Sequence, residues 1–386
     1  MAKHALLSAS GAHRWLECTP SAQLELQFPQ STSEYAEEGT AAHELCELTA
    51  RYWLGEISEA EYENQRDELA KGKYYNAEMQ ECANDYAKFV AEKTAAARET
   101  CEDAFTALEV RVDFSKYVKD GFGTGDCIIV SDNVLEIIDF KYGKGVRVEA
   151  AGNPQMKLYA LGAYLEYNTL FDIDSVRMTI FQPRLSGVQS SDEITVKELF
   201  EWAEKYVKPR AKLAYKGEGE FAPSEEVCKF CRAKAQCKAR ADKNLKLFDE
   251  APDILLLTPE DAGKILEQAG DIQSWLADLE SLVSSTLLAG QPVEGWKMVE
   301  GRSNRRFADE LKVVDAMKAA GYDESLLYER KLITLTQMEK DFGKKAVAET
   351  LGELIVKPQG KPTLAPAKDK RPEFRPEEQL LAEFDK

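Results

Sequence analysis

The chain has 386 residues, of which 44% are hydrophobic and 31% are charged, and its formal net charge at pH 7 is −18. This length exceeds one typical domain and predicts two or three, and the hydrophobic content is sufficient for a folded core. The negative charge excludes unspecific attraction of nucleic acid to the surface as a whole, so any such contact needs a local basic track.

The first hundred residues are predicted to be mainly helical. The stretch EGTAAHELCELTARYWLG, which begins at Glu38, has apolar residues at helical spacing and carries His43, one of three histidines in the chain. A histidine on a partly buried helix face often has only a structural role, so His43 alone does not indicate a site. Residues 51–101, rich in Glu, Ala, Tyr and Lys, predict two exposed helices over the core.

Three strands are expected next, near residues 105–114, 126–130 and 134–141. The last two are separated by the polar residues 131–133 and predict a β-hairpin. The hairpin would bring Asp126 and Asp139 together at one end, where two carboxylates repel unless a hard cation such as Mg²⁺ lies between them. Lys141, two residues past Asp139, lies on the same strand face and can orient a metal-bound water. Surface acids beside turns are also common without any function.

A helix is predicted near 153–167, with Pro154 in its first turn. Gln155 and Tyr159 stand four residues apart and share a helix face, where an amide and a phenol can hold a phosphate or a base. Core packing explains Tyr159 equally well. A strand near 175–182 and a helix near 196–216 follow, so strands bracketed by helices predict an α/β layered core.

The cysteines form a second pattern. Cys228, Cys231 and Cys237 follow a C-x2-C-x5-C spacing, and Cys18 lies near the start, so four thiolates can complete a tetrahedral set. No signal peptide or long apolar segment precedes them, so we expect a cytosolic protein with no membrane contact, in which the spacing favours metal binding over disulfides. Zinc and an iron–sulfur cluster both accept four cysteines, and the spacing does not choose between them. No ligand role is assigned to the scattered Cys46, Cys82, Cys101 and Cys127.

Past about residue 247 the pattern changes. A helix is expected with Thr258 as its N-cap and Gly290 at its end, followed by a β-hairpin-like arm over 292–307 and amphipathic helices over about 308–355. The arm carries a basic turn that either contacts phosphates or is an ordinary polar turn, with Arg302, Arg305 and Arg306. No Walker-type motif occurs, so any helicase motor must be a separate chain.

The tail from Lys357 is rich in proline and charge and is expected to be extended or disordered. Its segment Gln379–Phe384 is similar to the sliding-clamp-binding pattern of bacterial replication proteins, with Ala382 where that pattern has Leu. A frayed amphipathic turn at a chain end is the alternative.

In chain order, the segments LSASGAHRWLECTPSAQL, EGTAAH, GTGD, IIDFK, QMKLY and the three-cysteine pattern resemble the RecB-type branch of the PD-(D/E)XK nucleases, specifically its iron–sulfur members. These include the nuclease domain of AddB and the RecB-like exonucleases associated with CRISPR adaptation. The chain also resembles uncharacterised RecB-like proteins of phages and prophages. The resemblance covers roughly residues 6–240 and implies a restriction-endonuclease-like α/β core, with a mixed central sheet flanked by helices and a mainly helical C-terminal region.

The resemblance also implies roles for single residues. His43, Asp126 and Asp139 match metal ligands, with Gly125 in place of the motif proline, and Phe140 would offer its backbone carbonyl to the metal. Lys141 matches the motif lysine. The remaining matches are the DNA-proximal pair Gln155 and Tyr159 and the cluster ligands Cys18, Cys228, Cys231 and Cys237. Glu109, at the end of FTALEV, is a weaker candidate that we keep outside the catalytic set.

We therefore expect a Mg²⁺- or Mn²⁺-dependent DNA nuclease, an exonuclease acting on DNA ends or single strands in phage recombination, repair or replication. It would hold a 4Fe-4S cluster, or alternatively a structural Zn²⁺, and would work in the bacterial cytoplasm with phage or host replication or recombination proteins. The expected division is a nuclease domain, an accessory domain and a flexible tail, over residues 1–246, 247–356 and 357–386. The alternative is a non-catalytic DNA-binding or scaffold protein that keeps the fold and the cluster.

Overall fold

The computed structural model describes residues 5–29, 33–185, 189–249, 258–299, 309–329, 331–356 and residue 369. Two parts of the chain with predicted roles lie outside the described residues. They are the arginines of the predicted basic turn (Arg302, Arg305 and Arg306) and the tail from Lys357 apart from residue 369, which includes the segment Gln379–Phe384. Within the described ranges, no helix combines the length and the apolar character needed to cross a lipid bilayer.

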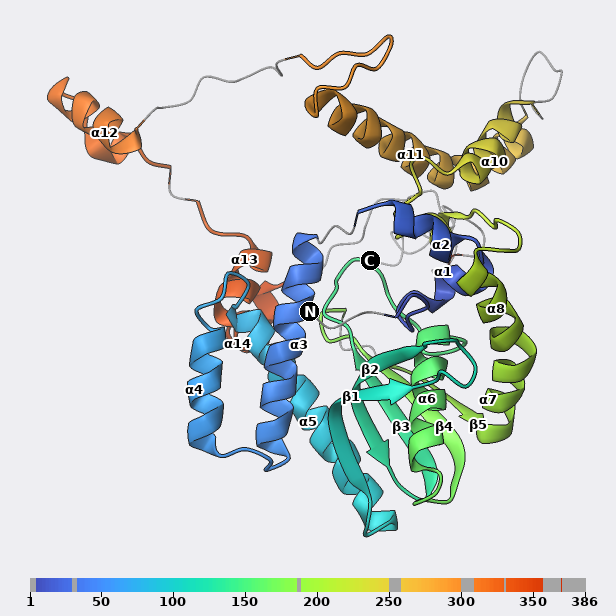
Figure 1. Cartoon of the computed structure of the whole chain (residues 1–386). Helices are drawn as coiled ribbons and strands as arrows, with labels where there is room; N and C mark the ends of the chain where they lie inside the picture. The colour runs from blue at the N-terminus through green and yellow to red at the C-terminus, as the bar shows by residue number, and fades with distance from the viewer. Residues whose placement is uncertain are drawn as a thin grey trace, which may run out of the picture.

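A five-stranded mixed sheet forms the centre of the molecule (Figure 1). Its strands lie in chain order across the sheet: β1 (Phe105–Asp113), β2 (Phe122–Val130), β3 (Asn133–Phe140), β4 (Ile173–Phe181) and β5 (Gln189–Thr195). The β3–β4 pair is parallel, and the other three pairs are antiparallel. The mixed sheet flanked by helices confirms the predicted α/β, restriction-endonuclease-like fold. Strand β5 was not predicted, because its polar sequence QSSDEIT lies at an edge of the sheet.

The predicted hairpin is formed by β2 and β3. Val130 pairs with Leu135, and the turn between them contains Asn133 with a φ of 69°, a left-handed conformation that asparagine tolerates better than most residues. The hydroxyl of Ser131 donates to the carbonyl of Val134 at 2.8 Å and closes the turn. Strand β2 begins at Phe122, earlier than predicted, because its first half pairs with β1.

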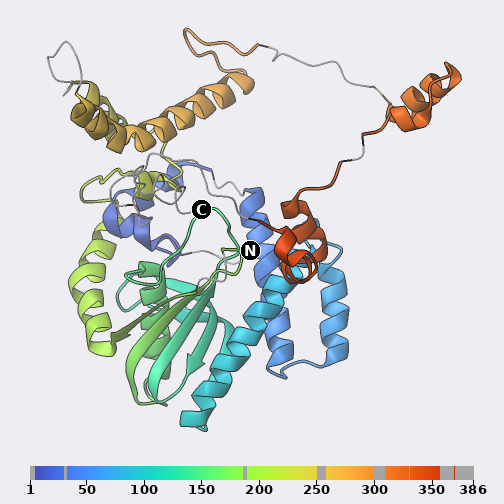
Figure 2. The same cartoon turned by 180° about the vertical axis from the view of Figure 1, so that it is seen from behind.

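Helices cover both faces of the sheet (Figures 1 and 2). One face packs against α3 (Glu34–Trp53) and α5 (Ala77–Thr100), and the other against α6 (Pro154–Tyr167), the crossover between β3 and β4. Helices α1 (Ala12–Glu17) and α7 (Val196–Trp202) contact α6. The other short elements of this part of the chain are α2 (Ser21–Leu24), η1 (Glu25–Gln27), the π-helical η2 (Ala203–Val207), α8 (Lys208–Lys216) and α9 (Glu225–Cys228).

Side-chain alternation along β3 explains why this strand is central. Leu135 and Ile137 are fully buried toward α6, whereas Ile138 and Phe140 are buried toward α3 and α5. A strand that is apolar on both faces must be covered on both, which requires a three-layer arrangement.

The two helices expected over residues 51–101 differ from each other. The helix α4 (Glu59–Leu69) has no buried residue, as expected for an exposed cover. The prediction is wrong for α5, whose Met79, Tyr86 and Val90 are buried against the sheet. The physical reason is that its apolar residues form one stripe, which glutamates, lysines and alanines on the other faces obscure in the composition.

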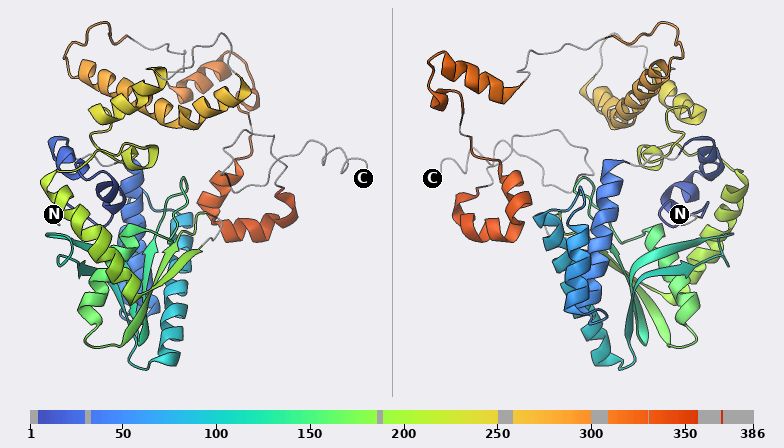
Figure 3. Two further views of the ribbon diagram at one scale, coloured as in Figure 1. Left: turned by 90° about the vertical axis from the view of Figure 1, so that its right-hand side faces the viewer. Right: turned by 60° about the vertical axis from the view of Figure 1, so that its left-hand side comes forward.

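The region after α9 is helical (Figure 3). It contains α10 (Lys238–Asp249), α11 (Pro259–Leu288), α12 (Glu310–Ala319), η3 (Glu324–Leu326), α13 (Leu335–Phe342), α14 (Lys344–Leu351) and η4 (Gly352–Leu354). Thr258 caps α11 as predicted. The described part of the expected hairpin-like arm contains a single antiparallel bridge, between Val293 and Trp296. Helix α10 runs across residue 246, where a domain boundary was expected.

Polar contacts hold two of these helices together and attach another of them to α5. Arg240 of α10 is buried and lies 2.6 Å from Asp278 and 3.2 Å from Asp271, both on α11. Farther along the chain, the backbone N–H groups of Lys344 and Lys345 at the start of α14 donate to the carboxylate of Glu81 on α5, at 2.7 and 2.8 Å. A carboxylate at a helix N-terminus is favoured by the unpaired N–H groups there.

Gly162 lets α6 approach β1. A Cβ atom at this position would lie 2.9 Å from the Cβ of Val112 and 3.2 Å from the backbone nitrogen of Asp113, neither of which can move without shifting the strand. We expect Gly162→Ala to lower the free energy of unfolding by about 1–3 kcal/mol, as overpacking does. Urea denaturation would measure the change. The matched control is Gly263→Ala in α11, where a Cβ meets nothing within 4 Å, and it should stabilise the protein by up to about 1 kcal/mol.

Candidate metal and active site

The candidate site lies where β2 and β3 separate. Cys127 and Ile138 are the last paired residues of the hairpin, and the same register continues to Asp126 and Asp139. The backbone N–H of Phe140 donates to Asp126 Oδ2 at 2.7 Å, which fixes this carboxylate between the two strands. The structure therefore brings the two predicted carboxylate positions to one end of the hairpin.

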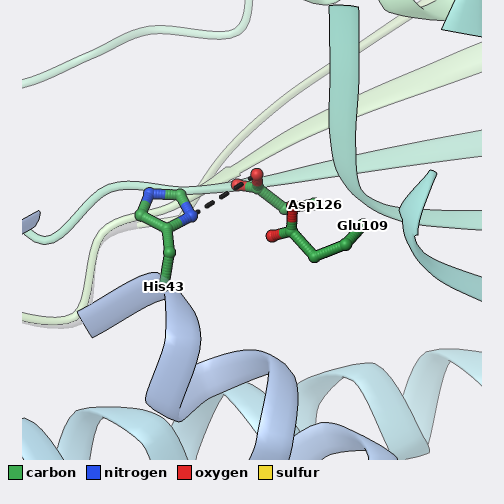
Figure 4. Close-up of side chains that lie close together, drawn as sticks. All are labelled: His43, Glu109 and Asp126. Carbon is green, nitrogen blue, oxygen red and sulfur yellow. Dashed lines mark ion pairs between the residues drawn. The ribbon is translucent and has the colours of Figure 1, made fainter. Parts of the chain in front are cut away.

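His43 and Glu109 complete a ligand set with Asp126 (Figure 4). The Nδ1 atom of His43, on α3, lies 3.4 Å from Asp126 Oδ1. One ligand atom from each of the three residues lies within 4.8 Å of the other two, and no other set of His, Cys, Asp and Glu ligand atoms in the described ranges meets this spacing. An imidazole and two carboxylates converging in this way can bind a divalent cation.

Glu109 occupies a strained position in β1. Its φ is 50°, a left-handed value that is uncommon for a residue other than glycine. Leu108 pairs with Cys127 and Val110 with Gly125, so the register places Glu109 opposite Asp126. Strain of this kind costs about 1–3 kcal/mol and concentrates at functional sites. From the sequence, Glu109 was a weaker site candidate outside the catalytic set, and the β1–β2 register now places it beside Asp126.

The conformation of Glu109 also switches the faces of β1. Leu108 packs toward α3 and α5, whereas Val110 and Val112 pack toward α6. In a regular strand, residues 108, 110 and 112 would share one face. The left-handed conformation of Glu109 thus lets its side chain reach the site, while Leu108 and Val110 still pack into the core on opposite faces of the sheet.

The charges of the site raise the pKa values of Glu109 and His43. Burial and the negative charge of Asp126 raise the pKa of Glu109 to about 7. Burial lowers the pKa of His43, but the adjacent carboxylate of Asp126 and the charge of Asp139 outweigh it, so the pKa of His43 is raised. Without a bound cation, both groups therefore keep their protons to a higher pH than usual.

The buried Asp139 and the partly exposed Lys141 form an ion pair beside this set. Lys141 Nζ lies 2.8 Å from Asp139 Oδ2, and Gln155 Nε2 donates to Asp139 Oδ1 at 3.2 Å. Burial raises the pKa of Asp139 although the lysine opposes it, and for Lys141 the charges of Asp139 and Asp126 outweigh burial and raise its pKa. Lys141 therefore stays protonated. Asp139 is not among the three residues whose ligand atoms lie within 4.8 Å of one another, and the ligand roles predicted for Asp139 and the Phe140 carbonyl stay predictions.

Gln155 and Tyr159 lie on α6 beside Asp139. The amide nitrogen of Gln155 donates to the hydroxyl of Tyr159 at 3.2 Å, and Tyr159 is buried. A Cβ atom on Gly123 of β2 would lie 2.6 Å from Cε1 of the Tyr159 ring. The first glycine of GTGD therefore makes room for the tyrosine. The predicted role of both side chains toward DNA stays a prediction.

The loop after Lys141 is held by residues that sequence analysis missed. Gln182, just past β4, donates to the carbonyls of Gly143 and Val146 at 2.8 and 2.9 Å and accepts from the N–H of Val148 at 3.1 Å. Arg184 contacts Glu78 on α5 at 2.9 Å and stacks over Tyr142 at 4.1 Å. No local pattern marks these residues, because their partners are far away in the sequence.

The four predicted cluster cysteines line one cavity. Cys18 follows α1, and Cys228, Cys231 and Cys237 lie in and after α9; all four border the same space, together with Phe221 and Val227. Burial raises the pKa of Cys18 and of Cys228, and it raises the pKa of Cys231 to about 12. Cys46, Cys82 and Cys127 are buried singly in the core cluster between the sheet and α3 and α5. The structure thus gathers only the predicted four around this cavity.

Residues 4–372 match the model of the family described as "Protein of unknown function (DUF2800)". The chain belongs to this family. The match extends over the sheet, the candidate site, the cysteine cavity and the helical region that follows. The family description assigns no activity, so a function for this DUF2800 protein has to come from its own residues.

Three solved structures are similar to this DUF2800 protein at low identity. The crystal structure of a "putative exonuclease" from Eubacterium rectale has 14% identity and a TM-score of 0.30, and covers 58% of this chain and 86% of its own. An alkaline exonuclease from Laribacter hongkongensis has 14% identity and a TM-score of 0.21, covering 53% and 91%. Its complex with dAMP has 15% identity and a TM-score of 0.22, covering 47% and 93%. Scores this low support no conclusion about function.

Glu109 provides a pH-dependent test of the site. Its pKa in the folded state, about 7, lies above that of an exposed glutamate, so ionising it opposes folding as the pH rises from about 4.5 to 7, and the penalty is complete above pH 7. We expect Glu109→Gln to stabilise the metal-free protein by about 1–2 kcal/mol at pH 8, after allowance for solvent at the half-buried carboxyl, and by nothing near pH 4.5.

Urea denaturation at both pH values, with EDTA present, measures this difference. The exposed Glu102→Gln is the matched control and should change stability at neither pH. Equal stabilisation by Glu109→Gln at both pH values would show that the carboxyl group is not under electrostatic stress.

Proposed function

We propose that this protein is a nuclease that hydrolyses phosphodiester bonds of DNA with the help of a divalent cation, Mg²⁺ or Mn²⁺. The observation that carries the proposal is the meeting of two sets of side chains where β2 and β3 separate. His43, Glu109 and Asp126 converge within 4.8 Å, and the Asp139–Lys141 pair lies next to them. Three carboxyl groups, an imidazole and an ammonium at one point suit a reaction in which a phosphate is bound, attacked and relieved of charge.

The donor set fits a divalent cation. Two carboxylates are typical of Mg²⁺ sites, and the imidazole also suits Mn²⁺. The raised pKa values of His43 and Glu109 support the fit, because they indicate an excess of negative charge that a cation would neutralise. His43, Glu109 and Asp126 would hold the ion, and the carboxylate of Asp139 and the carbonyl of Phe140 are proposed to add to them.

The bound ion would supply a Lewis acid for the phosphate and lower the pKa of an attacking water. The protein groups then have separate tasks. Lys141, whose Nζ lies 2.8 Å from Asp139 Oδ2, donates a hydrogen bond to the attacking water and stabilises the negative charge that develops on the phosphate. Gln155 keeps Asp139 in place through its 3.2 Å hydrogen bond and offers, with Tyr159, polar contacts to the substrate strand.

The finer assignment rests on the resemblance of the sequence motifs to RecB-type nucleases. It makes the protein an exonuclease for DNA ends or single strands, active in phage recombination, repair or replication in the bacterial cytoplasm, with phage or host proteins as partners. Residues 1–246 would form the nuclease domain, residues 247–356 a helical accessory domain and residues 357–386 a tail. The ion pairs of Arg240 support close attachment between the first two parts.

We expect Asp126→Asn, Asp139→Asn and Lys141→Ala each to reduce DNA cleavage by about a hundredfold or more, because all three act in the same step. Glu109→Gln should instead raise the Mn²⁺ concentration needed for half-maximal activity by about tenfold, since one ligand is lost while the others remain. Gel assays with end-labelled single- and double-stranded DNA over a Mn²⁺ titration measure both effects.

Two exposed residues provide controls with the same chemical change. Asp174→Asn on β4 and Lys197→Ala on α7 should cleave at the parent rate. If the parent protein cuts neither kind of DNA with Mn²⁺, or if Lys141→Ala cuts at the parent rate, the nuclease assignment is wrong. A non-catalytic DNA-binding or scaffold protein that keeps the fold would then be favoured.

We further propose that Cys18, Cys228, Cys231 and Cys237 hold a 4Fe-4S cluster. The cavity that all four line supports a shared ligand. Four thiolates at this place suit either a 4Fe-4S cluster or a single Zn²⁺ ion, and the resemblance of the sequence motifs to iron–sulfur nucleases favours the cluster.

The proposed cluster would connect distant parts of the chain. About 210 residues separate Cys18 from Cys228, and the segment between them contains the whole sheet. Closing so long a loop restricts the unfolded chain strongly, so the cluster would stabilise the fold and need take no part in cleavage.

Protein purified without oxygen is therefore expected to be brown, with broad absorbance near 400 nm. Cys231→Ala should remove the colour and lower the melting temperature, because one of four ligands is lost. The matched control is Cys101→Ala, which removes a buried cysteine at the end of α5, outside the cavity lining, and should keep the colour. Colourless parent protein with one equivalent of zinc and no iron after anaerobic reconstitution would contradict the cluster and favour Zn²⁺.

A further inference from the structure

A groove lined by five lysines lies between α8 and the turn that connects β1 to β2. Its volume is about 610 Å³, and its walls are formed by residues 115–120 on one side and by α8 on the other. Two tyrosines lie among the lysines, Tyr117 on the turn and Tyr215 on the helix. The lysines are Lys116, Lys119, Lys208, Lys212 and Lys216.

The charge of this groove is opposite to that of the molecule. The chain carries a net charge of −18, yet the groove lining contains one acidic residue, Asp120, whose carboxylate accepts a hydrogen bond from Tyr215 at 3.0 Å. Glu204 lies 2.8 Å from Lys208, and Glu218 lies 3.7 Å from Lys216. Five cations thus face three carboxylates here, and a local positive potential remains.

Three of the lysines are available to a ligand. In the described part of the chain, no carboxylate lies within ion-pair distance of Lys116, Lys119 or Lys212. Lys119 Nζ instead lies 4.2 Å from the centre of the Tyr215 ring, a cation–π contact that holds the ammonium over the groove without neutralising it. The groove therefore presents positive charge in fixed positions.

The lysines of α8 are spaced regularly. Lys208, Lys212 and Lys216 are each four residues apart, so they share a helix face and follow one another at about 6 Å along the axis. Consecutive phosphates of an extended strand have a comparable separation. None of the lining residues belongs to a strand, so the groove offers no sheet edge of the kind to which an extended peptide adds.

Strand β2 connects the candidate site to the turn that forms the groove. Asp126 belongs to the site, Gly123 carries the ring of Tyr159, and β2 begins at Phe122, directly after the turn that forms the groove. Four strand residues from Asp126 to Phe122 span about 13 Å. A nucleic acid strand bound at Tyr159 therefore reaches the groove within a few nucleotides.

We propose that this lysine groove binds the phosphate backbone of a single DNA strand on its way to or from the site. The inference rests on the proposed nuclease function for the substrate class, whereas the groove itself rests on its own charge and spacing. It would let a protein of strong negative charge hold a polyanion by one local track. Binding there is independent of base sequence, because only phosphates are contacted.

The test compares two triple variants with equal changes of charge. Lys116, Lys119 and Lys212 are replaced by Gln in one variant, and the exposed Lys197, Lys264 and Lys312 in the other. Fluorescence anisotropy with fluorescein-labelled oligothymidine of about 30 nucleotides, in EDTA and at low salt, should show about tenfold weaker binding for the groove variant and parent affinity for the control. The dependence of log K on log salt should fall by about 2, at about 0.7 per lost single-strand contact.

The outcomes separate the groove from the nuclease assignment. Equal DNA binding by both triple variants would contradict the proposed role of the lysine groove. The cleavage assays would then still test the nuclease function. Groove-dependent binding by a parent protein that cuts no DNA would support the groove and overturn the nuclease. Displacement of the labelled strand by polyglutamate as effectively as by unlabelled oligothymidine would overturn the DNA assignment and point to an acidic protein segment.

Discussion

Three carboxyl groups meet where β2 and β3 separate, and much of the molecule is arranged to offset their repulsion. The register from β1 to β3 aligns Glu109, Asp126 and Asp139, which in isolation would repel one another in a half-buried place. A backbone N–H fixes Asp126, an ammonium neutralises Asp139, and the pKa of Glu109 is raised. What remains is an excess of negative charge suited to a cation.

The layers of the fold supply these offsetting groups from both sides. Helix α3 brings His43 from one face of the sheet, and α6 brings Gln155 from the other. Glycines permit this approach, since the ring of Tyr159 lies over Gly123 and α6 itself lies against β1 at Gly162. Strand β3 holds the backbone before Lys141, and Gln182 and Arg184 hold the loop after it. Small residues and distant polar contacts thus determine how precise the site can be.

Charge is distributed unevenly over the molecule. The site is acidic and half-buried, the surface as a whole is acidic, and the lysine groove beside α8 is basic. The cysteine cavity lies at the start of the helical region, where Lys234, one of its lining residues, is 2.8 Å from Asp278 of α11. The ion pairs of α11 with Lys234 and with Arg240 of α10 therefore connect the C-terminal helices to the cysteine segment. A change in the structure of the cysteine segment would alter the packing of these helices.

The sequence by itself determined the elements that depend on local pattern: the hairpin around residues 131–133, the proline-started helix α6, the Thr258 cap and the α/β class. It also marked Asp126, Asp139 and Lys141 through their spacing on the hairpin, and His43 through the resemblance of its motif to RecB-type nucleases. Only the tertiary structure decided that Glu109 joins His43 and Asp126, that α5 is a core helix, and that the turn after β1 forms a groove with α8. Each of these depends on contacts between residues far apart in the chain, which no local pattern records.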